Sequence, residues 1–239
     1  MNDEPPALPP RNSFEYVRMD EPPTTWSVIS ALLKQPGKVV CELLEGRAAT
    51  VLGALSLVAV VALGLYGLVV GSLEGGAQYG IAPAKIVGGS AVAALICLPS
   101  LFVFLCLNGA DVRLRDVVSL LMASICLTAV LLVSLAPIAW IFSQSTDSVA
   151  FMACLHIVLW LVALGFGLRL LSKSAIIAWS GASSRLGVWA CIYVLVCLQM
   201  MTAMRPIVGA SPTLLPTEKQ FFLAHWMHIL GGSLEPGRD

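Results

Sequence analysis

The chain has 239 residues, of which 58% are hydrophobic and only 12% are charged, and its formal net charge at pH 7 is zero. An average soluble domain carries about 25% charged residues, so this composition excludes an ordinary water-soluble domain. The zero net charge and the scattered lysines also exclude the basic surface by which proteins bind nucleic acid.

Residues 1–24 are Pro-rich and acidic, with paired prolines at 5–6, 9–10 and 22–23. Proline fixes φ and removes a backbone donor, so this segment does not support a regular helix. We expect an extended cytoplasmic arm that is either disordered or laid over a partner.

Residues 25–46 predict two short amphipathic helices that lie in the membrane interface. Thr25 is a suitable N-cap for the first helix, and the Pro36-Gly37 pair separates it from the second. Both pieces carry apolar residues at helical spacing, and Lys34 and Lys38 are expected to point outward. A packed soluble mini-domain is the alternative, although it would be short of core.

The domain at 47–209 contains five uncharged stretches that are long enough to cross a bilayer. A hydrocarbon core of about 30 Å requires roughly 20 apolar residues in a helix, and lipid admits only helices or closed barrels. The stretches lack the alternation of barrel strands, so we predict an all-α polytopic membrane protein with five transmembrane helices. They run over 48–73, 86–110, 117–142, 148–168 and 186–204, with a loop at 143–146.

Lysine and arginine determine the predicted orientation, because the cytoplasmic segments of membrane proteins carry an excess of both. With the N-terminus inside, ten of the fourteen basic residues fall on the cytoplasmic side. We therefore expect a multi-pass protein of the inner (plasma) membrane, with its N-terminus cytoplasmic and its C-terminus external.

Several residues in the predicted spans indicate how the helices pack. Gly67 and Gly71 form a GxxxG step that permits the close approach of another helix. Pro99 and Pro137 are expected to kink the second and third spans, and two kinked helices side by side would offer a broken-helix binding site. Five tryptophans lie mostly near span ends and are expected to form interfacial belts: Trp140, Trp160, Trp179, Trp189 and Trp226.

Residues 210–239 are expected to form a loop and a short interfacial helix. Thr217 opens a capping-box pattern ahead of an apolar run at 221–230, which is too short to span a membrane. His225 and His228 share one face of this helix. Zinc needs three or four convergent ligands, so a metal site here is disfavoured.

His156 is the only ionisable residue clearly inside a predicted span, and such residues are functional candidates by default. A neutral imidazole is satisfied by one hydroxyl or carbonyl, and no charged residue lies deep in another span to relay a proton, so structural packing is favoured over a ligand or proton role. Gln199 and Arg205 close the fifth span. Arg205 is expected to reach the outer headgroups; the alternatives are that it caps carbonyls freed at Pro99 or Pro137, or binds an anionic lipid.

The sequence lacks the common signatures of catalysis. It has no H-E-x-x-H zinc motif, no G-x-S-x-G nucleophile elbow and no Walker-type phosphate loop. Its seven cysteines, none of them in C-x-x-C spacing, are expected to be packing residues. We therefore expect no enzymatic activity, no cofactor and no metal.

From about Trp26 onward the chain resembles a poorly characterised group of bacterial multi-span inner-membrane proteins. The residues that carry this resemblance are Lys85-Ile-Val-Gly88, the segment 95–104 with Asn108-Gly109, and Gln199-Met200 with the segment 205–209. The five-span layout behind a Pro-rich cytoplasmic N-terminus is also similar to that of Yip-type membrane proteins. The resemblance implies a bacterial membrane protein and brings no catalytic residues with it.

The leading hypothesis is a non-catalytic integral membrane subunit or scaffold of a larger inner-membrane assembly. The N-terminal arm and the short helices on both sides of the spans offer docking surfaces. Its partners are then the lipid bilayer and either other membrane-protein subunits or further copies of the chain. The alternative is a small transporter or channel with a site near Pro99 and Pro137.

Overall fold

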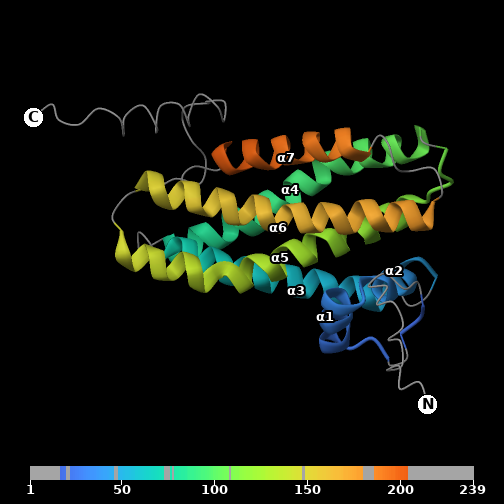
Figure 1. The fold of residues 1–239 in the computed structure, drawn as a ribbon, viewed down its shortest axis with the longest axis horizontal. Helices are drawn as coiled ribbons and strands as arrows, with labels where there is room; N and C mark the ends of the chain where they lie inside the picture. Colours follow the sequence, from blue (N-terminus) through green and yellow to red (C-terminus); the bar gives the residue numbers. More distant parts are fainter. Residues whose placement is uncertain are drawn as a thin grey trace, which may run out of the picture.

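The computed structural model describes residues 17–19, 22–45, 48–72, 76, 78–107, 109–146, 149–179 and 186–203. The regular structure of this part is α-helical throughout, which confirms the all-α prediction. In chain order the helices are α1 Thr25–Lys34, α2 Pro36–Glu45, α3 Ala48–Gly71, α4 Gln78–Leu107, α5 Leu114–Ser145, α6 Val149–Ala178 and α7 Leu186–Ala203 (Figure 1).

Four helices are long and apolar enough to cross a bilayer: α3, α4, α5 and most of α6. The chain is therefore a multi-span membrane protein. Helix α7 contributes a shorter apolar stretch over Leu186–Met200, and a stretch of that length falls just below the roughly 17 residues that a span requires. The described residues thus establish four of the five predicted spans.

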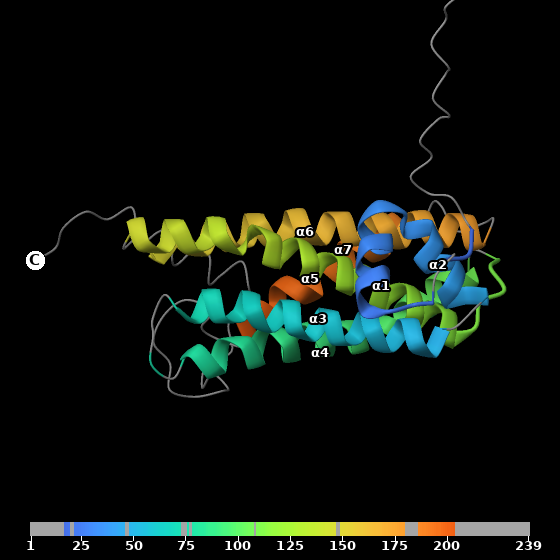
Figure 2. The ribbon, with the colours of Figure 1, turned by 90° about the horizontal axis from the view of Figure 1, so that it is seen from below.

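Helices α3 to α7 run alternately up and down one long axis, and α1 and α2 cover one end of the bundle (Figures 1 and 2). The main packing partners are α3 with α4 and α5, α5 with α6, and α4 with α7. Helix α5 contributes buried side chains to both apolar clusters of the core. It is therefore the central helix of the fold.

Three predicted spans are shorter than the corresponding helices. Helix α6 continues past the predicted end of its span at residue 168 as far as Ala178. Helix α4 begins at Gln78 rather than near residue 86, so that Lys85 lies inside the helix and only 5% of its surface is exposed. Helix α5 runs through the predicted loop at 143–146 as far as Ser145. There the hydroxyls of Ser143 and Ser145 donate to carbonyls of their own helix, at 2.6 and 3.0 Å, so these serines are accommodated without ending it.

The two helices predicted within 25–46 are present, with a different cap. Thr24 rather than Thr25 is the N-cap of α1, and it forms a capping box with Ser27. The backbone N–H of Ser27 donates to Thr24 Oγ1 at 3.3 Å, and that of Thr24 donates to Ser27 Oγ at 2.9 Å. Pro36 occupies the first position of α2, where a missing N–H removes no helical hydrogen bond.

Helix α2 is packed into the end of the bundle, whereas α1 is partly exposed. Val39, Val40 and Leu43 of α2 are almost completely buried, and the helix contacts α3, α5 and α6. Residues 17–19 lie along it: Arg18 Nη2 donates to the carbonyl of Glu45, and the N–H of Met19 donates to Glu42 Oε1, each at 3.3 Å. Residues 1–16 of the predicted arm and the predicted C-terminal helix lie outside the described residues.

The GxxxG prediction is confirmed at the end of α3. A Cβ at Gly67 would lie 2.5 Å from the Cα of Pro83, and a Cβ at Gly71 would lie 2.5 Å from the carbonyl oxygen of Gln78. Both glycines therefore allow the first turns of α4 to approach α3 backbone to backbone.

Candidate functional site

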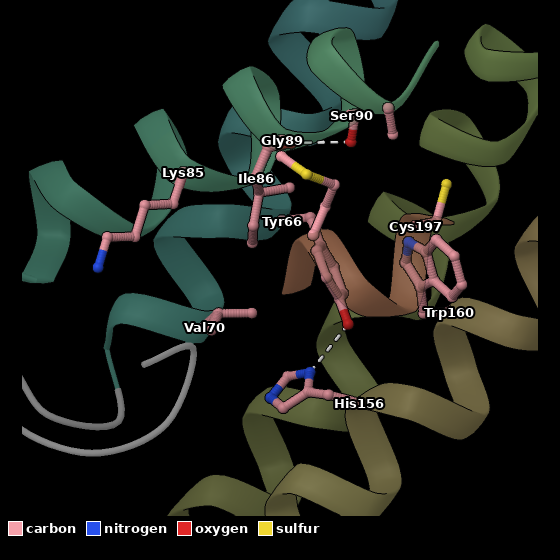
Figure 3. Close-up of a pocket in the computed structure, with 11 residues that line it drawn as sticks. Tyr66, Val70, Lys85, Ile86, Gly89, Ser90, His156, Trp160 and Cys197 are labelled. Atoms are coloured by element: carbon pink, nitrogen blue, oxygen red, sulfur yellow. Dashed lines mark hydrogen bonds between the residues drawn. The ribbon is translucent and has the colours of Figure 1, made fainter. Parts of the chain in front are cut away.

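A buried hydrogen bond joins the first and fourth spans. The hydroxyl of Tyr66 on α3 lies 2.8 Å from Nδ1 of His156 on α6, and the two rings meet edge to face with their centroids 5.8 Å apart (Figure 3). Only 4% of the Tyr66 surface and 3% of the His156 surface are exposed. The two residues are 90 positions apart in the sequence, and their hydrogen bond fixes the relative position of α3 and α6.

The second imidazole nitrogen of His156, Nε2, differs from Nδ1 in its hydrogen bonding. Nε2 is buried and has no hydrogen-bond partner among the described residues; Ser119 Oγ is the other such side-chain atom. Buried polar side-chain atoms are satisfied in the large majority of cases. His156 Nε2 lies inside a span and has no hydrogen-bond partner among the described residues. It therefore marks a candidate functional position.

His156 lines a cavity of about 50 Å³ between α3, α4, α6 and α7. Lys85 approaches this cavity from α4, and in Figure 3 its ammonium points away from the Tyr66–His156 pair. The walls are otherwise mostly apolar. The lining residues are Tyr66, Val70, Lys85, Ile86, Gly89, Ser90, Ala93, His156, Trp160, Cys197 and Met200.

A second, smaller cavity of about 20 Å³ shares Ser90, Trp160 and Cys197 with the first. Two of the four hydroxyl groups that line it donate to carbonyls of their own helices. Ser90 Oγ donates to the carbonyl of Ile86 at 2.8 Å, and Thr128 Oγ1 donates to that of Ser124 at 2.9 Å. His156, which lines only the first cavity, is thus the residue of this region that keeps a buried side-chain nitrogen without a hydrogen-bond partner among the described residues.

The structure separates the other predicted site residues. Pro99 and Pro137 both lie on the exposed surface of continuous helices, about 31 Å and 12 Å from the same end of the bundle at 1.5 Å per residue. They therefore form no common site. Gln199 lies half-buried on α7 next to Met200, but it does not line the cavity.

The remaining candidates fall in the segment after residue 203. Arg205, His225 and His228 lie outside the described residues, as does Trp226. Within the described part, no three His, Cys, Asp or Glu side chains converge on a position that could hold a metal ion. The seven cysteines are free thiols, and Cys41, Cys97, Cys126 and Cys197 are buried among the helices.

Sequence reasoning found His156 but missed Tyr66, Lys85 and Trp160. Tyr66 carried a usable signal, because a tyrosine inside a span needs a partner for its hydroxyl. Lys85 was placed outside the helix because the start of α4 was misplaced. No feature of the sequence identified Trp160 as a cavity wall.

The prediction of an interfacial position is wrong for Trp189. It is 99% buried, its Nε1–H donates to Ser100 Oγ at 3.0 Å, and its ring stacks on Tyr193 with a centroid distance of 5.2 Å. This residue joins α7 to α4 just beyond Pro99. It is therefore a packing anchor inside the bundle, whereas Trp140 is 51% exposed as a belt residue would be.

Comparison with protein-family models, with curated proteins and with solved structures gives no match. The functional argument for this chain therefore rests on its own residues.

Proposed function

We propose that this protein is a non-catalytic integral membrane subunit or scaffold of a larger inner-membrane assembly. The observation that carries the proposal is the arrangement at the α1–α2 end of the bundle. Helix α2 is packed into the spans, while α1 presents Trp26 with 78% of its surface exposed. Tryptophan is enriched among the residues that anchor protein interfaces.

The interior of the bundle favours this proposal over transport. The cavity that His156 lines has a volume of only about 50 Å³, and a larger cavity of about 250 Å³ between α3, α4 and α5 has, among the described residues, no charged side chain in its lining. The two outward-facing prolines offer no broken-helix site. Ion-coupled transporters generally place paired or relayed charges within their spans. In the described part of the spans, Lys85 is the one buried charged residue.

We also propose five crossings with the α1–α2 end in the cytoplasm. Helix α7 has 18 residues and is therefore about 27 Å long, close to the thickness of the hydrocarbon core. The described basic residues support the orientation, because all except Lys85 belong to the half of the bundle that carries α1 and α2: Arg18, Lys34, Lys38, Arg113, Arg115, Arg169 and Lys173.

The topology is tested by fusing alkaline phosphatase, which is active only outside the cytoplasm, and a fluorescent protein, which folds best inside it. A fusion after residue 239 should give phosphatase activity and little fluorescence. A fusion between α4 and α5, after Ala110, should give the reverse. Fluorescence from the C-terminal fusion would contradict five crossings.

The subunit proposal is tested by purification from native membranes in mild detergent, followed by native mass spectrometry. We expect stoichiometric association with other subunits. Trp26→Ala should release them, because it removes the exposed anchor, whereas Trp140→Ala should retain them, because it removes a tryptophan from α5 that is also exposed, to 51%. A chain that runs alone or as a homo-oligomer would overturn the proposal of a mixed assembly.

A further inference from the structure

The larger cavity is a crevice that α3, α4 and α5 form together. Helices α4 and α5 both pack closely on α3, but they make far less contact with each other. The space that this leaves has a volume of about 250 Å³. Its lining residues fall within 56–63 of α3, 87–98 of α4 and 118–125 of α5. The crevice therefore extends along about two to three helical turns, or about 10–17 Å at 1.5 Å per residue.

The crevice is open on the exposed flank of the bundle. Val60 and Leu95 line it, and 53% and 69% of their surfaces are exposed. Ala91, which also lines it, is exposed as well. All three helices are long and apolar enough to cross a bilayer. The medium at the mouth of the crevice is therefore the hydrocarbon of the membrane.

The interior of the crevice offers little to water. Its two serine hydroxyls are bonded within their own helices: Ser56 Oγ donates to the carbonyl of Leu52 at 2.8 Å, and Ser90 is bonded as described above. An apolar cavity of about 150 Å³ inside a protein stays dry and takes up an apolar ligand instead. This crevice is larger and faces lipid, so we expect hydrocarbon to fill it.

The length of the crevice matches that of one acyl chain. The chains of one leaflet extend over half of the hydrocarbon core, which is about 15 Å. The lining segments begin close to the α1–α2 end of the bundle: residue 118 lies four residues after the start of α5, and residue 98 lies nine residues before the end of α4. A chain can therefore enter from that leaflet and continue toward the middle of the membrane.

Arg115 supplies a contact for a lipid headgroup at this end of the crevice. It is exposed and lies three residues before Val118, so that the two residues are neighbours on one face of α5. Met122 and Ile125 continue the same face along the crevice. The adjacent acid, Asp116, is turned away by about 100° around the helix axis. A guanidinium binds phosphate through two parallel hydrogen bonds, so this position favours a phospholipid over a neighbouring apolar helix.

We propose that the crevice binds a membrane phospholipid. One acyl chain lies between α4 and α5, and Arg115 binds the phosphate of the headgroup. The lipid belongs to the leaflet at the α1–α2 end of the bundle, where α5 begins (Figure 1). This site is for binding alone, and it holds whether or not the chain is a subunit of an assembly.

The test uses the full chain in nanodiscs that contain phosphatidylglycerol with a photoreactive diazirine in one acyl chain. Mass spectrometry locates the labelled residues after illumination. Leu98 lines the crevice and is half-buried, whereas Leu161 lies on α6 outside the crevice and is 39% exposed. Bulk lipid would label the more exposed leucine at least as strongly. We expect Leu98 to be labelled about threefold more, the preference that about five additional carbon contacts give.

Two variants separate the chain from the headgroup. Ala91→Phe places a ring in the mouth of the crevice and should lower labelling of Leu98 about threefold. Ala84→Phe is its control, because Ala84 is exposed seven residues earlier on the same face of α4 and does not line the crevice. Arg115→Gln should lower the labelling about three- to tenfold, as loss of a charged hydrogen bond predicts. Arg169→Gln, which changes an exposed arginine of α6, should leave it unchanged.

Equal labelling of Leu98 and Leu161 in the wild type would overturn the proposal, and so would labelling of Leu98 that persists in Ala91→Phe. If Ala91→Phe instead releases a second copy or another subunit, the crevice holds a protein helix and the proposal fails. Unchanged labelling in Arg115→Gln would overturn the assignment to a phospholipid. If gel filtration shows that Ala91→Phe does not fold, the wild-type ratio and Arg115→Gln decide.

Discussion

Gly167→Ala is expected to separate α6 from α5 and to destabilise the bundle by about 1–3 kcal/mol, the usual cost of overpacking a tightly packed core. A Cβ at Gly167 would overlap Thr128 Oγ1 and would lie 2.7 Å from the carbonyl oxygen of Ser124. The carbonyl belongs to the backbone of α5, and Thr128 is already bonded to it. This carbonyl cannot move without shifting the central helix.

Gly165→Ala is the matched control, two residues away on the same helix. A Cβ there meets nothing within 4 Å, and exchanging glycine for alanine in a helix interior stabilises it by about 0.5–1 kcal/mol. The measurement is the rate at which the buried thiol of Cys126 on α5 reacts with a maleimide, in a background where the other cysteines are serine. Gly167→Ala should accelerate the reaction, and equal rates in both variants would contradict the close packing of α5 and α6.

Gly67→Ala should produce the second large effect, at the contact between α3 and α4. The added methyl would lie 2.5 Å from the Cα and 2.9 Å from the nitrogen of Pro83. Since proline is rigid and its backbone is part of α4, we expect a loss of about 1–3 kcal/mol. This displacement should also open the cavity, because Tyr66 and Lys85 flank the contact on the two helices.

The thermal midpoint of the detergent-solubilised protein, followed by gel filtration after heating, checks this expectation. Gly64→Ala, one turn earlier on α3, has nothing within 4 Å of its Cβ and should leave the midpoint unchanged or slightly higher. A midpoint for Gly67→Ala equal to that of Gly64→Ala would show that α3 and α4 are not in backbone contact at this point.

Much of the secondary structure followed from the length of the apolar runs. A helix that crosses lipid must satisfy its own backbone over a fixed thickness, so uncharged stretches of sufficient length indicate spans directly. The break between α1 and α2 at Gln35–Pro36 and the small-residue step at Gly67 and Gly71 were also visible. The start of α4 and the ends of α5 and α6 were not visible. Residues such as Ser143 are compatible with both a loop and a helix.

The candidate site was only partly accessible from the sequence. His156 was apparent because an ionisable group within an apolar run is conspicuous. Three other features depend on which side of each helix faces inward. These are the hydrogen bond of His156 to Tyr66, the cavity that His156 lines together with Lys85 and Trp160, and the burial of Trp189.

The sequence by itself thus determined that the chain is an all-α membrane protein and where most of its crossings lie. Only the tertiary structure decided which residues of those helices meet. The physical reason is the solvent: lipid is as apolar as the core, so positions facing inward and outward carry the same kinds of side chain. The contrast of polar and apolar faces that orients a helix in water is therefore missing, and packing between small residues such as Gly67 and Gly167 sets the orientation instead.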